Sequence, residues 1–185
     1  MQNSLVIHPQ DETVAIEPAA LDAWLIAQDL AREGRPGPRF AELIDVEGVS
    51  VDVVQRLLRQ HEGASLAEAL HATAIRGAEL QPRPMVIVSC EMESPCCRPC
   101  GSEYLGELTD LLDAWWNDPS FQAHCPCGAH DRVPALDWKH LSGFARTSFA
   151  IESPLAFVGM TPTAKLLDAL RAWADTPWTW TWTAL

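Results

Sequence analysis

Apolar residues in the first part of the chain recur at helical spacing. Those that follow Pro18 fall on one side of a helix and predict a helix from this proline to Gly34: Leu21, Trp24, Leu25 and Leu30. The same criterion predicts further helices over residues 38–46, 50–63 and 65–77, and "SLAE" (Ser65 to Glu68) has the pattern of a capping box. We therefore expect residues 1–80 to form a mainly helical N-terminal part.

The pattern changes after two Pro/Gly-rich stretches, "GRPGPRF" and "QPRP". "PMVIVSC" (Pro84 to Cys90) is a continuous apolar run that predicts a buried central strand. A helix opened by Ser102, a strand over Phe144 to Glu152 and a helix after Thr161-Pro162 follow. Residues 81–185 are thus predicted to form an α/β (α+β) part with a small mixed sheet and helices on one face. We expect both parts to make one compact unit.

The chain closes with "WTWTWT", in which strict alternation predicts a strand. Trp178, Trp180 and Trp182 share one face of this strand, and threonines occupy the other. Three indoles in a row need cover, because exposed they would promote aggregation. The pattern leaves open whether the core or a partner protein covers them.

The charge balance narrows the classes of function. With 25 acidic and 13 basic residues, the chain has a formal net charge of −12. This charge repels nucleic-acid phosphates and anionic membranes. The sequence also has neither the pattern of a secretory signal nor a membrane span. We therefore expect a cytoplasmic protein that binds neither nucleic acid nor membranes.

Two cysteine pairs carry the clearest chemical signal in the sequence. Cys97 and Cys100 form a C-x2-C pair, and after 24 intervening residues Cys125 and Cys127 form a C-x-C pair. In a reducing compartment, cysteines serve more often as thiols or metal ligands than as structural disulfides. Two short pairs on Pro/Gly turns can supply the four thiolates of a tetrahedral zinc ion.

The stretches "CRPCG" and "CPCG" resemble the knuckles of zinc-ribbon-type four-cysteine sites, over about 35 residues. The second knuckle departs from that pattern, because zinc ribbons usually have two residues between the cysteines. The fourth ligand is therefore open: Cys127, or in its place Cys96 or His130. Four protein ligands would make the zinc structural, since catalytic zinc keeps a position free for water.

An enzyme is the first alternative. A strand followed by C-x-x-C and a helix also resembles the layout of thioredoxin-like thiol–disulfide proteins, and Glu91 and Glu93 could serve as a general base at an open zinc site. Acidic neighbours disfavour a reactive thiolate, however, and this alternative leaves the second cysteine pair without a role. No known catalytic motif occurs, and we assign no catalytic residue.

A transcriptional regulator is the second alternative. "FAELIDVEGVSVDVVQRLLRQ" (Phe40 to Gln60) is similar to a helix-turn-helix motif. The net charge and the absence of a basic arm favour a plain helical hairpin instead. By exclusion, the sequence predicts a non-enzymatic, zinc-stabilised protein that binds another protein with a basic surface, as an inhibitor, an immunity-type protein or an adaptor does.

Overall fold

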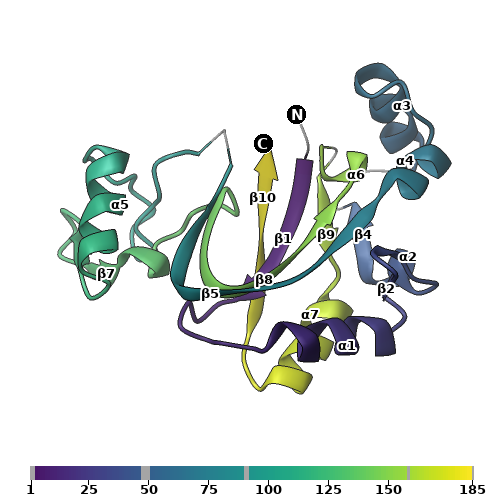
Figure 1. Cartoon of the computed structure of the whole chain (residues 1–185). Helices are drawn as coiled ribbons and strands as arrows, with labels where there is room; N and C mark the ends of the chain where they lie inside the picture. Colours follow the sequence, from purple (N-terminus) through teal and green to yellow (C-terminus); the bar gives the residue numbers. More distant parts are fainter. Residues whose placement is uncertain (1–2, 47–50, 90–91, 158, 185) are drawn as a thin grey trace.

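The centre of the molecule is a four-stranded sheet. The computed structural model describes residues 3–46, 51–89, 92–157 and 159–184. Within these ranges the sheet is antiparallel and has the strand order β10-β1-β8-β5. The four strands are β1 (Asn3–Pro9), β5 (Ala74–Val88), β8 (Ser142–Glu152) and β10 (Trp178–Ala184). Since β1 pairs with β10, the two ends of the chain lie next to each other (Figure 1).

Helices and three small strand pairs surround this sheet. The helices are α1 (Pro18–Ala27), α2 (Phe40–Leu43), α3 (Val51–His61), α4 (Leu66–Ala72), α5 (Leu108–Asn117), α6 (Pro154–Phe157), α7 (Ala164–Ala174) and the 3-10 helix η1 (Val133–Ala135). The paired short strands are β2 (Ala31–Arg32) with β3 (Arg35–Pro36), β4 (Ile44–Val46) with β9 (Met160–Pro162), and β6 (Gln122–His124) with β7 (His130–Arg132). Figure 1 shows α5 and β7 at one end of the molecule and α3 and α4 at the other.

One face of the sheet forms the larger hydrophobic core. Apolar side chains at paired positions of neighbouring strands point to this face and are buried, such as Leu5 opposite Ile151 and Ile7 opposite Phe149. Helices α1 and α7 pack below it, and their Trp24 and Trp173 rings stack with centroids 5.5 Å apart. Burial of this apolar surface is the main stabilising contribution to the fold.

The opposite face of the sheet is polar and strongly curved. Strand β5 contains two register shifts against β8, and such irregularities bend a sheet (Figure 1). The beginning of β8 consequently packs against β1 and β10. A Cβ atom at Gly143 would lie 2.4 Å from His8 Nε2 and 2.5 Å from Thr181 Oγ1, so this close approach requires glycine.

A second, smaller core lies at the end of the sheet. Its members come from α5, β6, η1, the chain that follows η1 and the beginning of β8: Leu111, Trp115, Ala123, Val133, Leu136, Trp138 and Phe144. We call residues 95–141 the cysteine lobe, since they hold both cysteine pairs and most of this core. The lobe is inserted between the two long strands β5 and β8.

The structure confirms the predicted α/β class and most helices and strands. Helix α1 begins at Pro18, and Ser65 caps α4 through the capping box, with its hydroxyl accepting from the Glu68 N–H at 3.2 Å. Strand β8 and the tryptophan strand β10 also lie where the sequence predicts strands. The sheet, however, is antiparallel throughout the described residues rather than mixed.

Five further predicted features were wrong. The helix predicted over residues 65–77 ends at Ala72, and strand β5 begins at Ala74. The helix from Pro18 ends at Ala27 instead of Gly34, and the predicted helix over residues 38–46 is the single turn α2 followed by strand β4. The run from Pro84 belongs to β5, which is the edge strand of the sheet and only partly buried. The helix expected from Ser102 begins at Leu108. In each case the observed structure is determined by strand pairing or by the path of the chain. The local sequence pattern encodes neither of these.

The division of the chain at residue 80 stays a prediction. Strand β5 runs across this position from Ala74 to Val88, and the N-terminal strand β1 lies inside the central sheet between β10 and β8. Within the described ranges, none of the helices combines the length and the apolar character needed to cross a lipid bilayer.

Candidate metal centre

Four cysteine sulfurs meet at the surface of the cysteine lobe. The Sγ atoms of Cys97, Cys100, Cys125 and Cys127 all lie within 4.8 Å of one another. Cys97 Sγ lies 3.7 Å from Cys127 Sγ, and Cys100 Sγ lies 3.5 Å from Cys125 Sγ. Both distances are too long for a disulfide bond of about 2.05 Å. They match the edges of a tetrahedron around zinc, which are about 3.8 Å for Zn–S bonds of about 2.3 Å.

The first cysteine pair sits on a tight turn. The Gly101 N–H donates to the Cys97 carbonyl at 2.7 Å, and the Cys97 N–H donates to the Ser102 carbonyl at 2.9 Å. Gly101 has a φ of +70°, a conformation that glycine adopts without steric cost. The turn brings the sulfurs of Cys97 and Cys100 to the same side.

The second cysteine pair forms the tip of the hairpin between β6 and β7. The Gly128 N–H donates to the Cys125 carbonyl at 2.8 Å, and the Cys125 N–H donates to the Ala129 carbonyl at 3.0 Å. Gly128 has a φ of +90°. The hairpin makes the short C-x-C spacing compatible with two sulfurs on one side, so the departure from the zinc-ribbon pattern has a structural reason.

The two alternate ligands lie outside this group. Cys96 is buried, and its backbone N–H and carbonyl bond Asp137 at 2.8 and 2.9 Å, which ties the first turn to the chain before Trp138. The His130 ring packs edge-on against His124, with centroids 4.3 Å apart. Among the described residues, the metal-compatible group contains the four cysteines alone.

The cysteine thiols influence one another's protonation. The hydroxyl and backbone N–H of Ser102 bond the Cys100 sulfur and lower its pKa to about 6. The Cys100 N–H lowers the pKa of Cys97. Burial and bonds to the three neighbouring sulfurs outweigh this effect and raise the pKa of Cys97 to about 12. For Cys125, the Cys127 N–H and the Cys97 sulfur lower the pKa, but burial and the bonds to the Cys127 and Cys100 sulfurs outweigh them, so its pKa is raised. Four adjacent thiolates repel each other, and a divalent cation removes that repulsion.

The surroundings of the cysteines differ from a thioredoxin-like site. The C-x-x-C turn is followed by irregular chain, and α5 begins only at Leu108, so the thiols do not sit at a helix N-terminus. The Glu93 carboxylate pairs with Lys139 Nζ at 3.1 Å. Cys90 and Glu91 lie outside the described residues.

The helix-turn-helix hypothesis also meets a structural difference. Helix α2 is a single turn, and strand β4 pairs with β9 where the first helix of that motif would continue. The expected turn, Gly48 to Ser50, lies outside the described residues.

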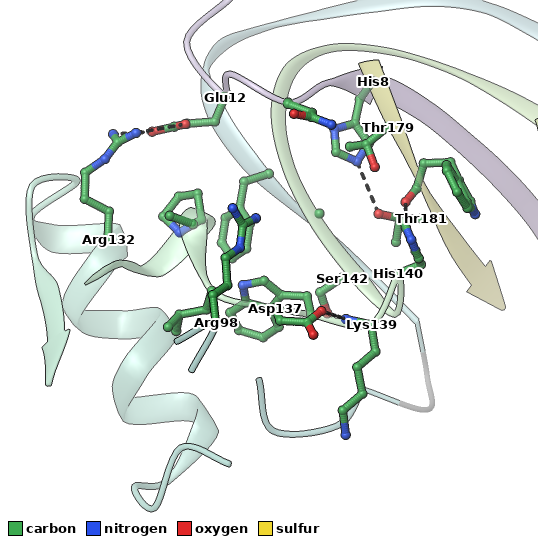
Figure 2. A pocket seen from close by; sticks show the side chains of 18 residues that line it. His8, Glu12, Arg98, Arg132, Asp137, Lys139, His140, Ser142, Thr179 and Thr181 are labelled. Carbon is green, nitrogen blue, oxygen red and sulfur yellow. Dashed lines mark hydrogen bonds and ion pairs between the residues drawn. The ribbon is translucent and has the colours of Figure 1, made fainter. Parts of the chain in front are cut away.

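A second feature, which the sequence analysis missed, is a cavity of about 330 Å³ beside the cysteine lobe. It lies between the polar face of the sheet and the chain from Pro134 to Phe144, and Arg98 of the first cysteine turn reaches into it (Figure 2). His8, His140 and Thr181 line the side opposite Arg98. These residues are far apart in the sequence, so no local pattern could have brought them together.

His8 is the most buried ionisable group of this cavity, with 3% of its surface exposed. Its Nδ1 donates to the Pro9 carbonyl at 2.9 Å, and its Nε2 accepts from the Thr181 hydroxyl at 3.2 Å. This pair of bonds fixes the neutral tautomer with the proton on Nδ1. Burial lowers the pKa of His8 to about 4, with a further contribution from nearby His140.

Acid is therefore expected to destabilise the protein through His8. The unfolded chain takes up a proton near pH 6.5 and the folded chain only near pH 4, so stability falls as the pH drops between these values. The slope from this one group is about 1.4 kcal/mol per pH unit. We expect His8→Gln to remove this slope in urea unfolding measured from pH 7.5 to 5 with zinc in excess. His71→Gln, at an exposed site on α4, is the control, and equal slopes in wild type and His8→Gln would contradict the prediction.

Comparison with protein-family models, curated proteins and solved structures finds no match for this chain. The function must therefore be argued from the cysteine group and the surfaces around it.

Proposed function

We propose that the four cysteines hold one structural zinc ion and that the chain is a non-enzymatic zinc-stabilised protein that binds another protein. The observation that carries the zinc assignment is the set of four Sγ atoms within 4.8 Å, with the two closest pairs at tetrahedral-edge distances. Thiolate ligands favour zinc over magnesium or calcium. A four-thiolate shell leaves no position for a reacting water, so the metal shapes the lobe rather than a reaction.

The zinc would join two turns that are separated by 24 residues in the sequence. One turn follows the bridge at Cys96, and the other is the β6–β7 hairpin tip. Between them lies α5, whose Leu111 and Trp115 are buried in the smaller core. A core of this size is marginal by itself, and a metal crosslink is a common means of stabilising such a unit.

The surface of the lobe supports a protein partner of opposite charge. Exposed carboxylates line α5 and the turn before it: Glu107, Asp110 and Asp113. Two large apolar side chains lie exposed in the same region, Leu105 at 84% and Trp116 at 40%. Acidic groups around apolar contacts suit a partner with a basic rim and an apolar centre.

Metal analysis of the purified chain tests the zinc assignment. We expect one zinc per chain by inductively coupled plasma mass spectrometry, and a cobalt-substituted sample should show the intense visible bands of a tetrahedral thiolate site. A sample that is folded and monomeric but free of metal would refute the assignment. This measurement needs no knowledge of the partner.

Affinity capture from the native host tests the binding role. The bait pair is the wild type and the double variant Asp110→Asn with Asp113→Asn, which keeps the size and exposure of both side chains. A partner retained by the wild type at low salt and lost with the double variant supports the proposed surface. Equal capture by both baits would place the binding surface elsewhere.

A further inference from the structure

The cavity beside the cysteine lobe differs in charge from the rest of the protein. Three basic side chains line it, Arg98, Arg132 and Lys139, against the two carboxylates of Glu12 and Asp137. The whole chain, by contrast, carries a net charge of −12. By formal count the lining therefore carries one positive charge more than negative charges, on a protein that is acidic as a whole.

The basic side chains differ in their availability to a ligand. The Arg132 guanidinium bonds the buried Glu12 carboxylate with both of its terminal nitrogens, and Lys139 Nζ turns away to Glu93 at 3.1 Å and Glu103 at 3.7 Å. Arg98 makes no ion pair or hydrogen bond with its guanidinium to any described residue. Figure 2 shows its side chain extending from the cysteine turn with the guanidinium at the cavity.

The opposite wall offers two further polar groups. His140 Nδ1 donates to the Trp180 carbonyl at 2.9 Å, and its ring stacks on Trp180 with centroids 3.9 Å apart, which holds the imidazole in place and leaves Nε2 for another partner. Ser142 also lines the cavity, is 6% exposed, and its hydroxyl has no hydrogen-bond partner among the described residues. A buried hydroxyl without a partner is uncommon in folded proteins and is satisfied when a polar ligand binds.

We propose that this cavity binds a small organic anion that carries a carboxylate or phosphate group. The guanidinium of Arg98 has the planar fork geometry that pairs with two oxygens of either group. The Ser142 hydroxyl and His140 Nε2 offer hydrogen bonds to polar atoms of the same ligand. A volume of about 330 Å³ admits a molecule larger than an inorganic ion, which suits donors on two opposite walls.

The site depends on the cysteine lobe, because Arg98 lies between Cys97 and Cys100 in the first turn. A metal that fixes these two sulfurs also fixes the position from which Arg98 enters the cavity. This binding role is separate from the protein-binding role proposed above, and its test uses no protein partner.

Isothermal titration calorimetry on the zinc-loaded full chain tests the proposal at low ionic strength. The probes are inorganic phosphate and succinate, and the neutral succinamide serves as the matched control ligand. We expect at least one of the two anions to bind with millimolar or tighter affinity and succinamide not to bind. Stronger binding of one anion identifies phosphate or carboxylate as the preferred group. The absence of binding by both anions up to 20 mM would overturn the proposal.

Variants locate the binding to the cavity. Arg98→Gln should weaken the affinity about tenfold or more, since a charged bidentate pair is lost. Arg59→Gln, which removes an exposed arginine on α3, gives the same change in net charge and should stay within twofold of the wild type. Equal affinity for Arg98→Gln and wild type would overturn the proposal.

The zinc content of Arg98→Gln shows whether the first turn is intact. If that variant lost zinc, the binding site would be located in the wild type instead. The measurement is the change in amide and guanidinium NMR shifts when the anion that binds is added. Shifts centred on Arg98, His140 and Ser142 support the cavity as the site, and shifts confined to other regions overturn it.

Discussion

Replacing Cys125 by serine is expected to abolish zinc binding and to unfold the cysteine lobe. Cys125 Sγ lies 3.5 Å from Cys100 Sγ, so the substitution removes one corner of the four-sulfur group. Binding of structural zinc contributes on the order of 10 kcal/mol to folding in zinc-dependent domains. The smaller core cannot replace a contribution of this size, because among the described residues it contains seven buried apolar side chains. Hydrogen exchange should report loss of protection in α5 and in the β6–β7 hairpin, with β1 and β10 still protected.

Cys96→Ser is the matched control for this prediction. Cys96 neighbours the first ligand pair and is buried, but its sulfur lies outside the four-sulfur group. We expect this variant to keep one zinc per chain and the protected lobe. Loss of zinc from Cys96→Ser with retention in Cys125→Ser would reverse the ligand assignment.

The sequence was most informative where the structure depends on neighbouring residues. Both cysteine turns were predicted because proline and glycine set their backbone within a few residues, as with Gly101 and Gly128. The start of α1 at Pro18 and the capping box of α4 are local in the same sense. We predicted that the two turns meet because four thiolates form a tetrahedral zinc site. This inference does not depend on the path of the chain between the turns.

Features that depend on distant pairing could not be predicted in this way. The apolar run from Pro84 looks like a central strand, but its place at the sheet edge follows from the long pairing of β5 with β8. The predicted helix over residues 38–46 gives way to β4 because Ile44 and Val46 pair with Pro162 and Met160 of β9. Tertiary pairing overrides helical periodicity at such short segments.

The tryptophan strand shows the same limit. Alternation predicted the strand and its two faces, but not what covers them. Trp178 is buried, Trp180 and Trp182 are partly buried against the larger core, and Thr181 on the other face is also buried. The polar face is covered because the beginning of β8 packs on it through Gly143. The cavity that contains His8 and Thr181 results from this packing, which joins residues 173 positions apart.

Replacing Phe149 by alanine is expected to give the largest loss of stability in the sheet and to leave the zinc in place. Phe149 is 1% exposed, lies opposite Ile7 in the centre of the sheet and packs at an angle on Trp178, with centroids 6.4 Å apart. Removing a buried phenyl ring leaves a cavity and costs about 3–5 kcal/mol. Urea unfolding followed by far-UV circular dichroism should show this decrease, whereas Ile26→Ala, at a 57% exposed position on α1, should change stability by about 0.5 kcal/mol or less.

The zinc content separates this variant from the cysteine variants. Phe149 belongs to the larger core, and none of the described members of that core lies in the cysteine lobe. Below its lowered unfolding midpoint the variant should therefore still bind one zinc per chain. Cys125→Ser should show the opposite pattern, with zinc lost and the sheet retained. Because the two cores share strands β5 and β8 but have separate members, the pair of variants measures how far the metal stabilises the lobe alone. If Phe149→Ala released zinc while still folded, the two cores would be energetically coupled and the zinc would stabilise the whole chain.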